Sequence, residues 1–493
     1  MSYIIVIDQG TTSTRTMIFD QAARVVSVAQ KEITQYYDAP GWVNHDANEI
    51  WVSVLSTMAQ ALKQQSIDIN DVVSIGITNQ RETTVVWDKN TGNPICKAIV
   101  WQSRQTQEIC DELINKGYQH TIKDKTGLVI DPYFSATKIM WILENVPEAR
   151  EKANKNDLMF GTIDSWLIYK FTDGIHVTDH TNASRTMLYN IHTLIWDDDL
   201  LKLFDIPKSM MPDIKNTMDE FGNTKPFHTF GKSIPIRGVA GDQQAALFGQ
   251  RAFEKGMIKN TYGTGCFILM NTGRQPVLSE NGLLTTIAWV IDGKPTYALE
   301  GSVFVGGSAV QWLRDGLHLV DNASETEALA SSLSSNKGVY MVPAFVGLGT
   351  PYWDPHAKGA MYGLTRGTDE RHLARAALES IAYQSMDVID VMTQESNIDL
   401  KVLKVDGGAT ANRFLMQFQS DILNIEVVRP EMLETTALGA FYLAALQSKW
   451  FIDMNHLNDL DTNMTMFKPR MRQEDRVKNI EGWKDAVSRT MTT

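Results

Sequence analysis

A strand–turn–strand pattern occurs twice in this chain, at residues 3–19 and at residues 256–270. Each copy has an apolar run, a short turn rich in glycine and threonine, and a second apolar run, which is the pattern of a β-hairpin. The copies begin roughly half of the 493-residue chain apart. This spacing predicts duplication of one fold unit, although two unrelated hairpins remain an alternative from these segments alone.

The sequence around the hairpins alternates between strand and helix patterns. Apolar runs and apolar residues at helical spacing predict strands at residues 72–78, 83–87 and 401–405, and helices at residues 48–63, 372–391 and 438–446. This alternation is typical of α/β proteins. We therefore expect two α/β domains, residues 1–250 and residues 251–493, with the second starting just before the second hairpin.

Charge and hydropathy exclude several classes of partner. The chain has 46 Lys and Arg against 58 Asp and Glu, a net charge of −12, so it lacks the basic excess that binds nucleic acid or an anionic membrane. No run of about eighteen apolar residues occurs, and the first apolar run ends at Asp8, so we expect neither a membrane segment nor a signal peptide. Three widely spaced cysteines predict a reducing, cytoplasmic location without a disulfide framework.

The turn of the first hairpin carries groups suited to phosphate and metal. The sequence DQGTTS at residues 8–13 places one carboxylate, one glycine and three hydroxyl residues together. Glycine lets the backbone approach a phosphate, the amides and hydroxyls donate hydrogen bonds, and the Asp8 carboxylate can hold a hydrated Mg²⁺. An ordinary β-turn favours the same residue types and remains the alternative.

Two other loops share this character. The second hairpin turns through YGTG at residues 262–265, and DGGATANR at residues 406–413 follows a predicted strand and opens a helix. Each alone fits a plain glycine-rich turn. Together the three loops predict a phosphate-binding cleft between the domains, with Asn412 as a polar contact for the nucleotide.

Several residues are candidates for catalysis or substrate binding. Asp242 follows a glycine turn, where a carboxylate could act as general base toward an alcohol or cap the helix that begins there. The pair Arg81 and Glu82 follows a strand and could bind the hydroxyls of a polyol, or could be a surface ion pair. Three aromatic residues are, taken singly, better explained by core or interface packing: Trp101, Tyr133 and Phe267.

The chain resembles the FGGY carbohydrate kinases over nearly its whole length. The two signatures of that family match residues 133–145 and 359–379. Within the family, the branch that phosphorylates glycerol is matched at residues 8–15, 78–83, 100–104 and 240–245. The resemblance implies two actin- and hexokinase-like (RNase H-like) ATPase domains, each with a five-stranded sheet, and an active site in the cleft between them.

The resemblance also implies roles for single residues. The implied reaction transfers the γ-phosphate of ATP, with Mg²⁺, to a terminal hydroxyl of glycerol, with Asp242 as general base and Asp8 near the metal. Arg81, Glu82, Tyr133 and Gln243 match contacts to the hydroxyls, and Trp101 and Phe267 match an apolar wall. Thr11, Thr12, Ser13 and Arg15 match the first phosphate clamp, Thr264 matches the second, and Gly307, Gln311, Gly408 and Asn412 match the nucleotide site.

A missing loop and one histidine have implications for regulation. The loop through which some bacterial members bind fructose 1,6-bisphosphate is missing from residues 227–235, which points to the Gram-positive branch and against that inhibition. In that branch, a histidine at the position of His228 is phosphorylated by the phosphocarrier protein of the sugar phosphotransferase system. Thr229 follows it where an aromatic residue is more familiar, and an ordinary loop histidine is the alternative. A homodimer or homotetramer is also expected.

Two other functions compete with this interpretation. A pentulose kinase, or another sugar kinase of the same family, would share the fold, but Arg81, Glu82, Trp101 and Phe267 favour a small triol. A nucleotide-driven switch without kinase activity would also share the fold, but it would need neither Asp242 nor polyol contacts. Turnover of ATP with and without glycerol separates these possibilities.

Overall fold

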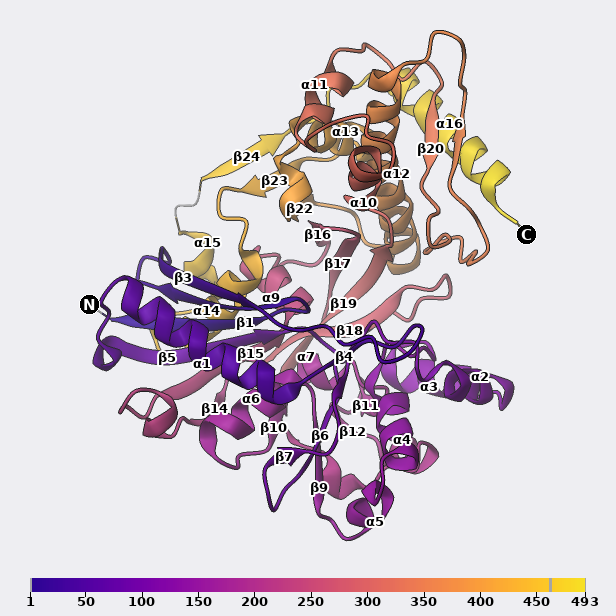
Figure 1. Cartoon of the computed structure of the whole chain (residues 1–493). Coiled ribbons are helices and arrows are strands. Elements are labelled where there is room, and N and C mark those ends of the chain that lie inside the picture. The colour runs from indigo at the N-terminus through magenta and orange to yellow at the C-terminus, as the bar shows by residue number, and fades with distance from the viewer. Residues whose placement is uncertain (1, 461–462, 493) are drawn as a thin grey trace.

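The computed structural model describes residues 2–460 and 463–492. Its first large sheet contains, in spatial order, β14 (Glu220–Asn223), β15 (Pro235–Gly241), β5 (Val72–Asn79), β1 (Tyr3–Gln9), β2 (Ser13–Phe19) and β3 (Val25–Glu32). The second contains β18 (Leu284–Ile291), β19 (Lys294–Val303), β17 (Cys266–Gly273), β16 (Met257–Tyr262), β22 (Val402–Asp406), β23 (Val427–Pro430) and β24 (Met464–Phe467). Figure 1 shows the two sheets in two lobes.

The two sheets repeat one set of pairings. β1 runs antiparallel to β2 and parallel to β5, and β16 runs antiparallel to β17 and parallel to β22. β15 then lies parallel to β5, as β23 lies parallel to β22. The same relations in both halves confirm the predicted α/β duplication, in which each predicted hairpin supplies two central strands.

The number of strands in each large sheet differs from the prediction, and one predicted strand lies outside both large sheets. The described sheets have six and seven strands rather than five, because β14 and β24 each pair with an edge and β18 pairs with β19, which satisfies backbone groups that an open edge would leave unpaired. The strand predicted at residues 83–87 is β6 (Val85–Asp88), which pairs with β7 (Asn93–Pro94) and β9 (Leu158–Gly161) in a separate small sheet.

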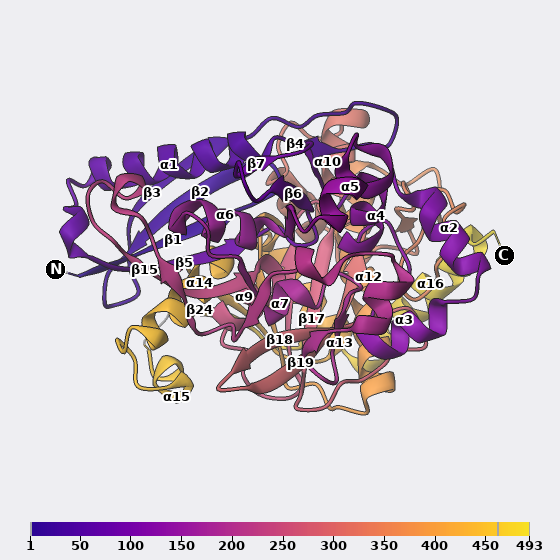
Figure 2. The ribbon, with the colours of Figure 1, turned by 90° about the horizontal axis from the view of Figure 1, so that it is seen from below.

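The three predicted helices are present and somewhat longer than predicted. They are α1 (Ala47–Gln64), α12 (Glu370–Ser396) and α14 (Thr435–Gln447). Seen from below, α1 and α14 lie on opposite sides of the first sheet (Figure 2), although α14 comes from the second half of the sequence. None of the helices in the described residues is both long and apolar enough to cross a bilayer.

The contact between α14 and α9 (Asp242–Gly249) brings two helix backbones together. A Cβ atom on Gly439 would lie 1.8 Å from the carbonyl oxygen of Ala245, and one on Gly249 would lie 2.0 Å from that of Thr435. Only glycine permits such an approach. The contact fixes α9, whose first residue is Asp242, against both halves of the molecule.

Candidate active site

A cavity of about 450 Å³ opens beside the turn of the second hairpin. It brings together the five residues predicted for the second phosphate clamp and the nucleotide: Thr264, Gly307, Gln311, Gly408 and Asn412. Its walls include α10 (Ser308–Gln311), α12 and the start of α13 (Arg413–Leu423). Sequence reasoning did not identify Arg314, Thr326 and Glu327, which also line it but lie in no recognisable motif.

The glycines of this cavity permit close backbone contacts. The amide of Gly307 donates a 2.9 Å hydrogen bond to the carbonyl of Gly263, and a Cβ on Gly307 would lie 2.7 Å from that oxygen. Asn412 caps α13, because its side-chain oxygen accepts a 2.9 Å hydrogen bond from the amide of Leu415. Asn412 therefore has a structural role as a helix cap and also lines the cavity, while its contact with a nucleotide stays a prediction.

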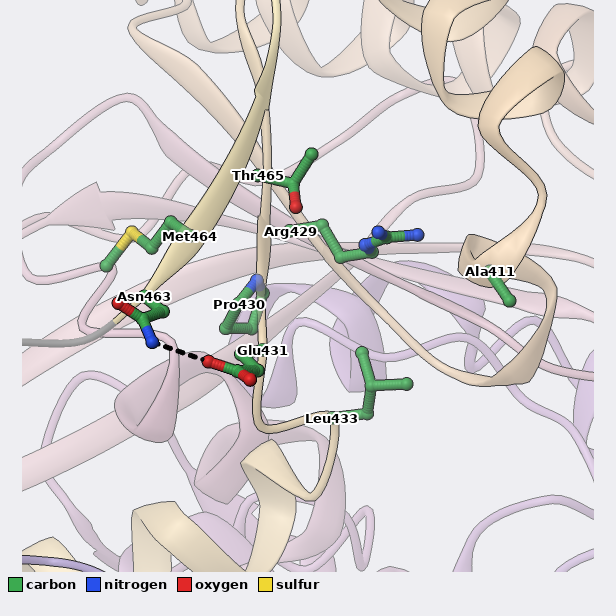
Figure 3. Close-up of a pocket in the computed structure, with 8 residues that line it drawn as sticks. All are labelled: Ala411, Arg429, Pro430, Glu431, Leu433, Asn463, Met464 and Thr465. Carbon is green, nitrogen blue, oxygen red and sulfur yellow. Dashed lines mark hydrogen bonds between the residues drawn. The ribbon is translucent and has the colours of Figure 1, made fainter.

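A second cavity, of about 470 Å³, lies next to the first and shares Ala411 with it. It lies where β23 ends and β24 begins. Its Glu431 and Asn463 are joined by a 2.7 Å hydrogen bond (Figure 3). None of the predicted site residues lines it. It therefore does not coincide with the predicted active site.

Asp242 lies at the start of α9 and faces Arg81. Gly241 is the N-cap residue of this helix, so Asp242 begins the helix and does not cap it, which corrects the structural alternative. Its Oδ1 accepts a 2.7 Å hydrogen bond from the amide of Gln243 and lies 3.2 Å from Nε of Arg81. Burial raises the pKa of Asp242, and the Arg81 charge opposes that rise. A carboxylate of raised pKa suits a general base.

The pair Arg81 and Glu82 is buried, which excludes a surface ion pair. Their side chains are 2% and 1% exposed. Arg81 donates through both terminal nitrogens to Glu300, at 2.6 and 2.9 Å, and Arg185 donates to Glu82 at 2.6 Å. Four charges thus meet in the interior, two of them from residues that the sequence motifs did not reveal.

The backbone of Glu82 is held in an uncommon conformation. Its φ of 57° lies in the left-handed region, which is costly for a residue with a side chain. Its carbonyl accepts hydrogen bonds from Ser135 and from Nζ of Lys138, each at 3.1 Å, and Lys138 also donates to the carbonyl of Tyr133 at 2.7 Å. Burial lowers the pKa of Lys138 to about 7. The signature helix α4 (Ser135–Asn145) thereby anchors two predicted substrate contacts.

An aromatic group contacts both hairpins. The ring of Trp101 lies 5.5 Å from that of Tyr133 and 6.5 Å from that of Phe267, centroid to centroid. Nε1 of Trp101 donates a 2.9 Å hydrogen bond to the hydroxyl of Thr11 in the first turn. The structure therefore places the predicted apolar wall between the two phosphate-clamp turns.

The turn of the first hairpin is flanked by a partly buried acid and an arginine. Asp8 and Arg15 are directly opposed in the β1–β2 register, and Arg15 forms an ion pair with Glu434 of the second half. Thr12 is exposed at the tip, and Ser13 accepts a 3.0 Å hydrogen bond from Gln30. Burial raises the pKa of Asp8 to about 7, although Arg15 counteracts this.

The residues near Asp8 fit Mg²⁺ only in one way. Across the described residues, no group of three or more His, Cys, Asp and Glu side chains could hold a metal ion. Mg²⁺ is commonly bound through one carboxylate, several waters and the phosphates of a nucleotide. A single partly buried carboxyl beside the predicted phosphate clamp fits a magnesium ion that arrives with its nucleotide.

Lys259 connects the two halves beside the base. It lies on β16, is fully buried, and donates to Oε1 of Gln243 and, at 2.9 Å, to the hydroxyl of Thr261. Burial lowers its pKa to about 8. A lysine in a buried strand is itself a sequence signal, because unpaired charges are rarely buried. Lys259, a residue of the second half, thus positions the side chain of Gln243, which is predicted to contact a substrate hydroxyl.

His228 lies outside this group. It ends a 3-10 turn, Pro226–His228, and its ring packs edge-on at 5.0 Å from that of Trp51. Phe227 beside it is 71% exposed. Burial, and then the charge of Lys170, lowers the pKa of His228, so its imidazole is neutral near pH 7.

Two repeated α/β sheets and a cavity beside the second hairpin fit the two-domain α/β kinases. The models of the FGGY family of carbohydrate kinases match this chain, with the N-terminal domain at residues 3–249 and the C-terminal domain at residues 258–448. The chain belongs to the FGGY family of carbohydrate kinases.

Named relatives agree with this assignment. The chain is 58% identical to a glycerol kinase of Oceanobacillus iheyensis over 99% of its own length and 98% of the relative's. It is 57% identical to that of Bacillus subtilis over 99% of each. The solved glycerol kinase of Plasmodium falciparum with ADP matches with a TM-score of 0.95 and 39% identity, covering 100% and 99%. A xylulose kinase of Lactobacillus acidophilus, 22% identical with a TM-score of 0.89 over 99% and 97%, shares the fold.

Proposed function

We propose that the protein transfers the γ-phosphate of ATP to a terminal hydroxyl of glycerol, which gives sn-glycerol 3-phosphate and ADP. The observation that carries this proposal is the meeting of Asp242 with the buried pair Arg81 and Glu82. The relatives that cover nearly the whole chain are named glycerol kinases, which supports the same reaction.

A neutral triol offers no charge to bind, so the site must use shape and hydrogen bonds. Arg81, Glu82, Tyr133 and Gln243 supply donors and acceptors for its hydroxyls. Trp101 and Phe267, whose rings lie edge to face with centroids 6.5 Å apart, supply an apolar wall for its carbons. Burial strengthens these hydrogen bonds, because water does not compete for them.

Asp242 acts as general base in the proposed reaction. Its carboxylate accepts the proton of the terminal hydroxyl while the oxygen attacks the γ-phosphorus and ADP leaves. The phosphate oxygens are held by Thr11, Thr12, Ser13 and Arg15 of the first turn and by Thr264 of the second. Mg²⁺, when bound with the nucleotide near Asp8, supplies positive charge for the phosphates. Closure of the lobes excludes water as a competing acceptor.

A coupled assay of ADP release over glycerol, xylulose, ribulose and gluconate tests this function. We expect the highest kcat/KM with glycerol, because the site fits three carbons. A higher kcat/KM with a ketopentose would reassign the substrate within the family. ATP turnover that is indifferent to every polyol would instead indicate a nucleotide switch.

We propose in addition that His228 is a phosphorylation site for a phosphocarrier protein. Its partial exposure, its place on a short surface turn and its neutral imidazole support nucleophilic attack on a phosphoryl donor. Added phosphate would bring negative charge close to Lys170. Incubation with phosphocarrier, its kinase enzyme and phosphoenolpyruvate should label the wild type. Equal labelling of His228→Ala would disprove the site.

We further propose that the enzyme works in the cytoplasm as a homodimer or homotetramer. The reaction consumes ATP, and the three cysteines are free thiols, which suits a reducing compartment. Light scattering coupled to size-exclusion chromatography gives the mass of the assembly, and a monomer at micromolar concentration would contradict the oligomer.

A further inference from the structure

We propose that Arg185 and Glu300 are positioning residues of the triol site. With Arg81 and Glu82 they form a four-charge ring, which fixes the atoms that this pair presents to the substrate. The inference rests on the triol site proposed above and extends it to two residues that lie far from it in the sequence, Glu300 being 219 residues from Arg81.

The ring is continuous. Arg81 donates to both carboxylate oxygens of Glu300, at 2.6 Å from Nη1 and 2.9 Å from Nη2. Arg185 donates from Nη2 to Oε1 of Glu300 at 3.1 Å and from Nε to Oε1 of Glu82 at 2.6 Å. Nε of Arg81 lies 3.8 Å from the same Oε1 of Glu82, which completes the circuit. The four side chains are at most 2% exposed.

The ring determines the direction in which its members point. Both terminal nitrogens of Arg81 donate hydrogen bonds to Glu300. The Nε atom of Arg81 therefore faces Asp242, whose Oδ1 lies 3.2 Å away. Because Arg185 takes Oε1 of Glu82, the other oxygen of Glu82 remains for a substrate hydroxyl. Orientation of such groups before binding lowers the cost of recognition.

Stability alone does not account for this arrangement. Buried ion pairs seldom stabilise a fold more than apolar side chains of equal volume. In addition, Nη1 of Arg185 is buried and has no hydrogen-bond partner among the described residues, which adds a desolvation cost. A costly ring next to the base indicates a functional reason for its retention.

Glu300 also links the ring to the apolar wall. It lies on β19, two residues from Ser302, which pairs with Phe267 of β17. Burial favours the neutral acid, but Arg185 and Arg81 outweigh burial and lower the pKa of Glu300 to about 2. Glu300 therefore remains charged at neutral pH. The second half thus contributes a fixed anion as well as Phe267 to a site whose other proposed residues come from the first half.

The test compares steady-state kinetics of wild type, Glu300→Gln and Arg185→Lys. Glu300→Gln keeps the shape and removes the charge, so we expect KM for glycerol to rise about tenfold or more, as for loss of a charged hydrogen bond, with KM for ATP nearly unchanged. Arg185→Lys keeps the charge without the two-pronged contact. It should raise KM for glycerol less, and it serves as the test if Glu300→Gln does not fold.

Glu379→Gln is the matched control. Glu379 is a buried carboxylate of the same half and accepts from Arg375 at 2.6 Å, but it lies in α12 and contacts none of the proposed triol residues. Glu379→Gln should lower Tm, as we also expect for Glu300→Gln, because each removes one charge from a buried ion pair. It should leave KM for glycerol unchanged. Equal increases in KM for both variants would reject a specific role for Glu300.

The double variant Arg185→Gln with Glu300→Gln separates position from stability. It removes one charge of each sign, so we expect Tm to recover toward wild type while KM for glycerol stays raised. Recovery of KM together with Tm, or unchanged KM in folded Glu300→Gln, would overturn the positioning role. A wild type that is inactive on glycerol would reject the proposed function itself, which is a distinguishable result.

Discussion

The two hairpins occupy the same place in their sheets but carry different chemistry. Each pairs with a parallel strand on one side, β5 or β22. The first turn is flanked by the opposed charges Asp8 and Arg15, whereas the second, at residues 262–265, carries none. The two repeated turns, both predicted to face phosphate, therefore differ in charge: only the first is flanked by an acid and a base.

The same difference appears one element later. α9 follows β15 and α14 follows β23, in equivalent places of the two sheets. α9 begins with Asp242, whereas α14 begins with Thr435. The fold thus provides two equivalent helix starts, and only the first carries a carboxylate, the one we propose as general base.

The largest effect should come from removing the base. Asp242→Asn should reduce kcat by about 10²–10⁴-fold, the usual contribution of a general base, with a smaller change in KM for ATP. Its counterpart Thr435→Val should change kcat far less, because no proton acceptor is lost. Single-turnover kinetics measure both, and retention of more than about a tenth of wild-type kcat in Asp242→Asn would refute the assignment.

The first turn should be more sensitive to magnesium than the second. Asp8→Ala should raise the Mg²⁺ concentration for half-maximal activity about tenfold or more, as expected for a partner of metal-bound water. The corresponding residue of the second hairpin is Thr261, and Thr261→Ala should leave the Mg²⁺ titration in place. If the Mg²⁺ dependence of activity were unchanged in Asp8→Ala, Asp8 would have only a structural role in the turn.

The crossing of α9 and α14 should tolerate no added side chain. Gly439→Ala should destabilise the protein by about 1–3 kcal/mol, the usual cost of overpacking, because the new Cβ would meet the carbonyl of Ala245. Gly367→Ala, whose Cβ would have 3.9 Å to its nearest neighbour, is the control and should stay within about 0.5 kcal/mol. Urea titration measures both, and equal stability of the two variants would contradict the close crossing.

The smallest effect concerns a buried acid in each half. Burial raises the pKa of Asp164 in the first half and of Asp387 in the second to about 7. Because each folded pKa exceeds the unfolded value, each contributes stability below about pH 4 that is lost as pH rises through 7. Asp387→Asn should therefore weaken the decline in Tm between pH 5 and 8, as should Asp164→Asn. Parallel Tm curves of wild type and both variants would contradict the raised pKa values.

Sequence patterns predicted the local elements well but not the contacts between distant segments. The hairpins, α1, α12 and α14 have periodic patterns that depend only on neighbours in the chain, so their existence could be predicted. Arg185 and Glu300 could not be paired with Glu82 and Arg81, because single charges carry no mark of a partner 103 or 219 residues away. Glu300 did leave a trace, as a lone acid in an apolar strand.

The place of α14 on the first sheet has a consequence for synthesis of the chain. The last strand of that sheet ends at Gly241, but α14 starts at Thr435, so at 5–20 residues per second the ribosome needs roughly 10–40 s to deliver it. During this interval the face that carries Phe19 lacks Phe441, which later stacks on it at 4.6 Å. A nascent first half therefore exposes an apolar sheet face, and we expect it to depend on chaperones until the second half emerges.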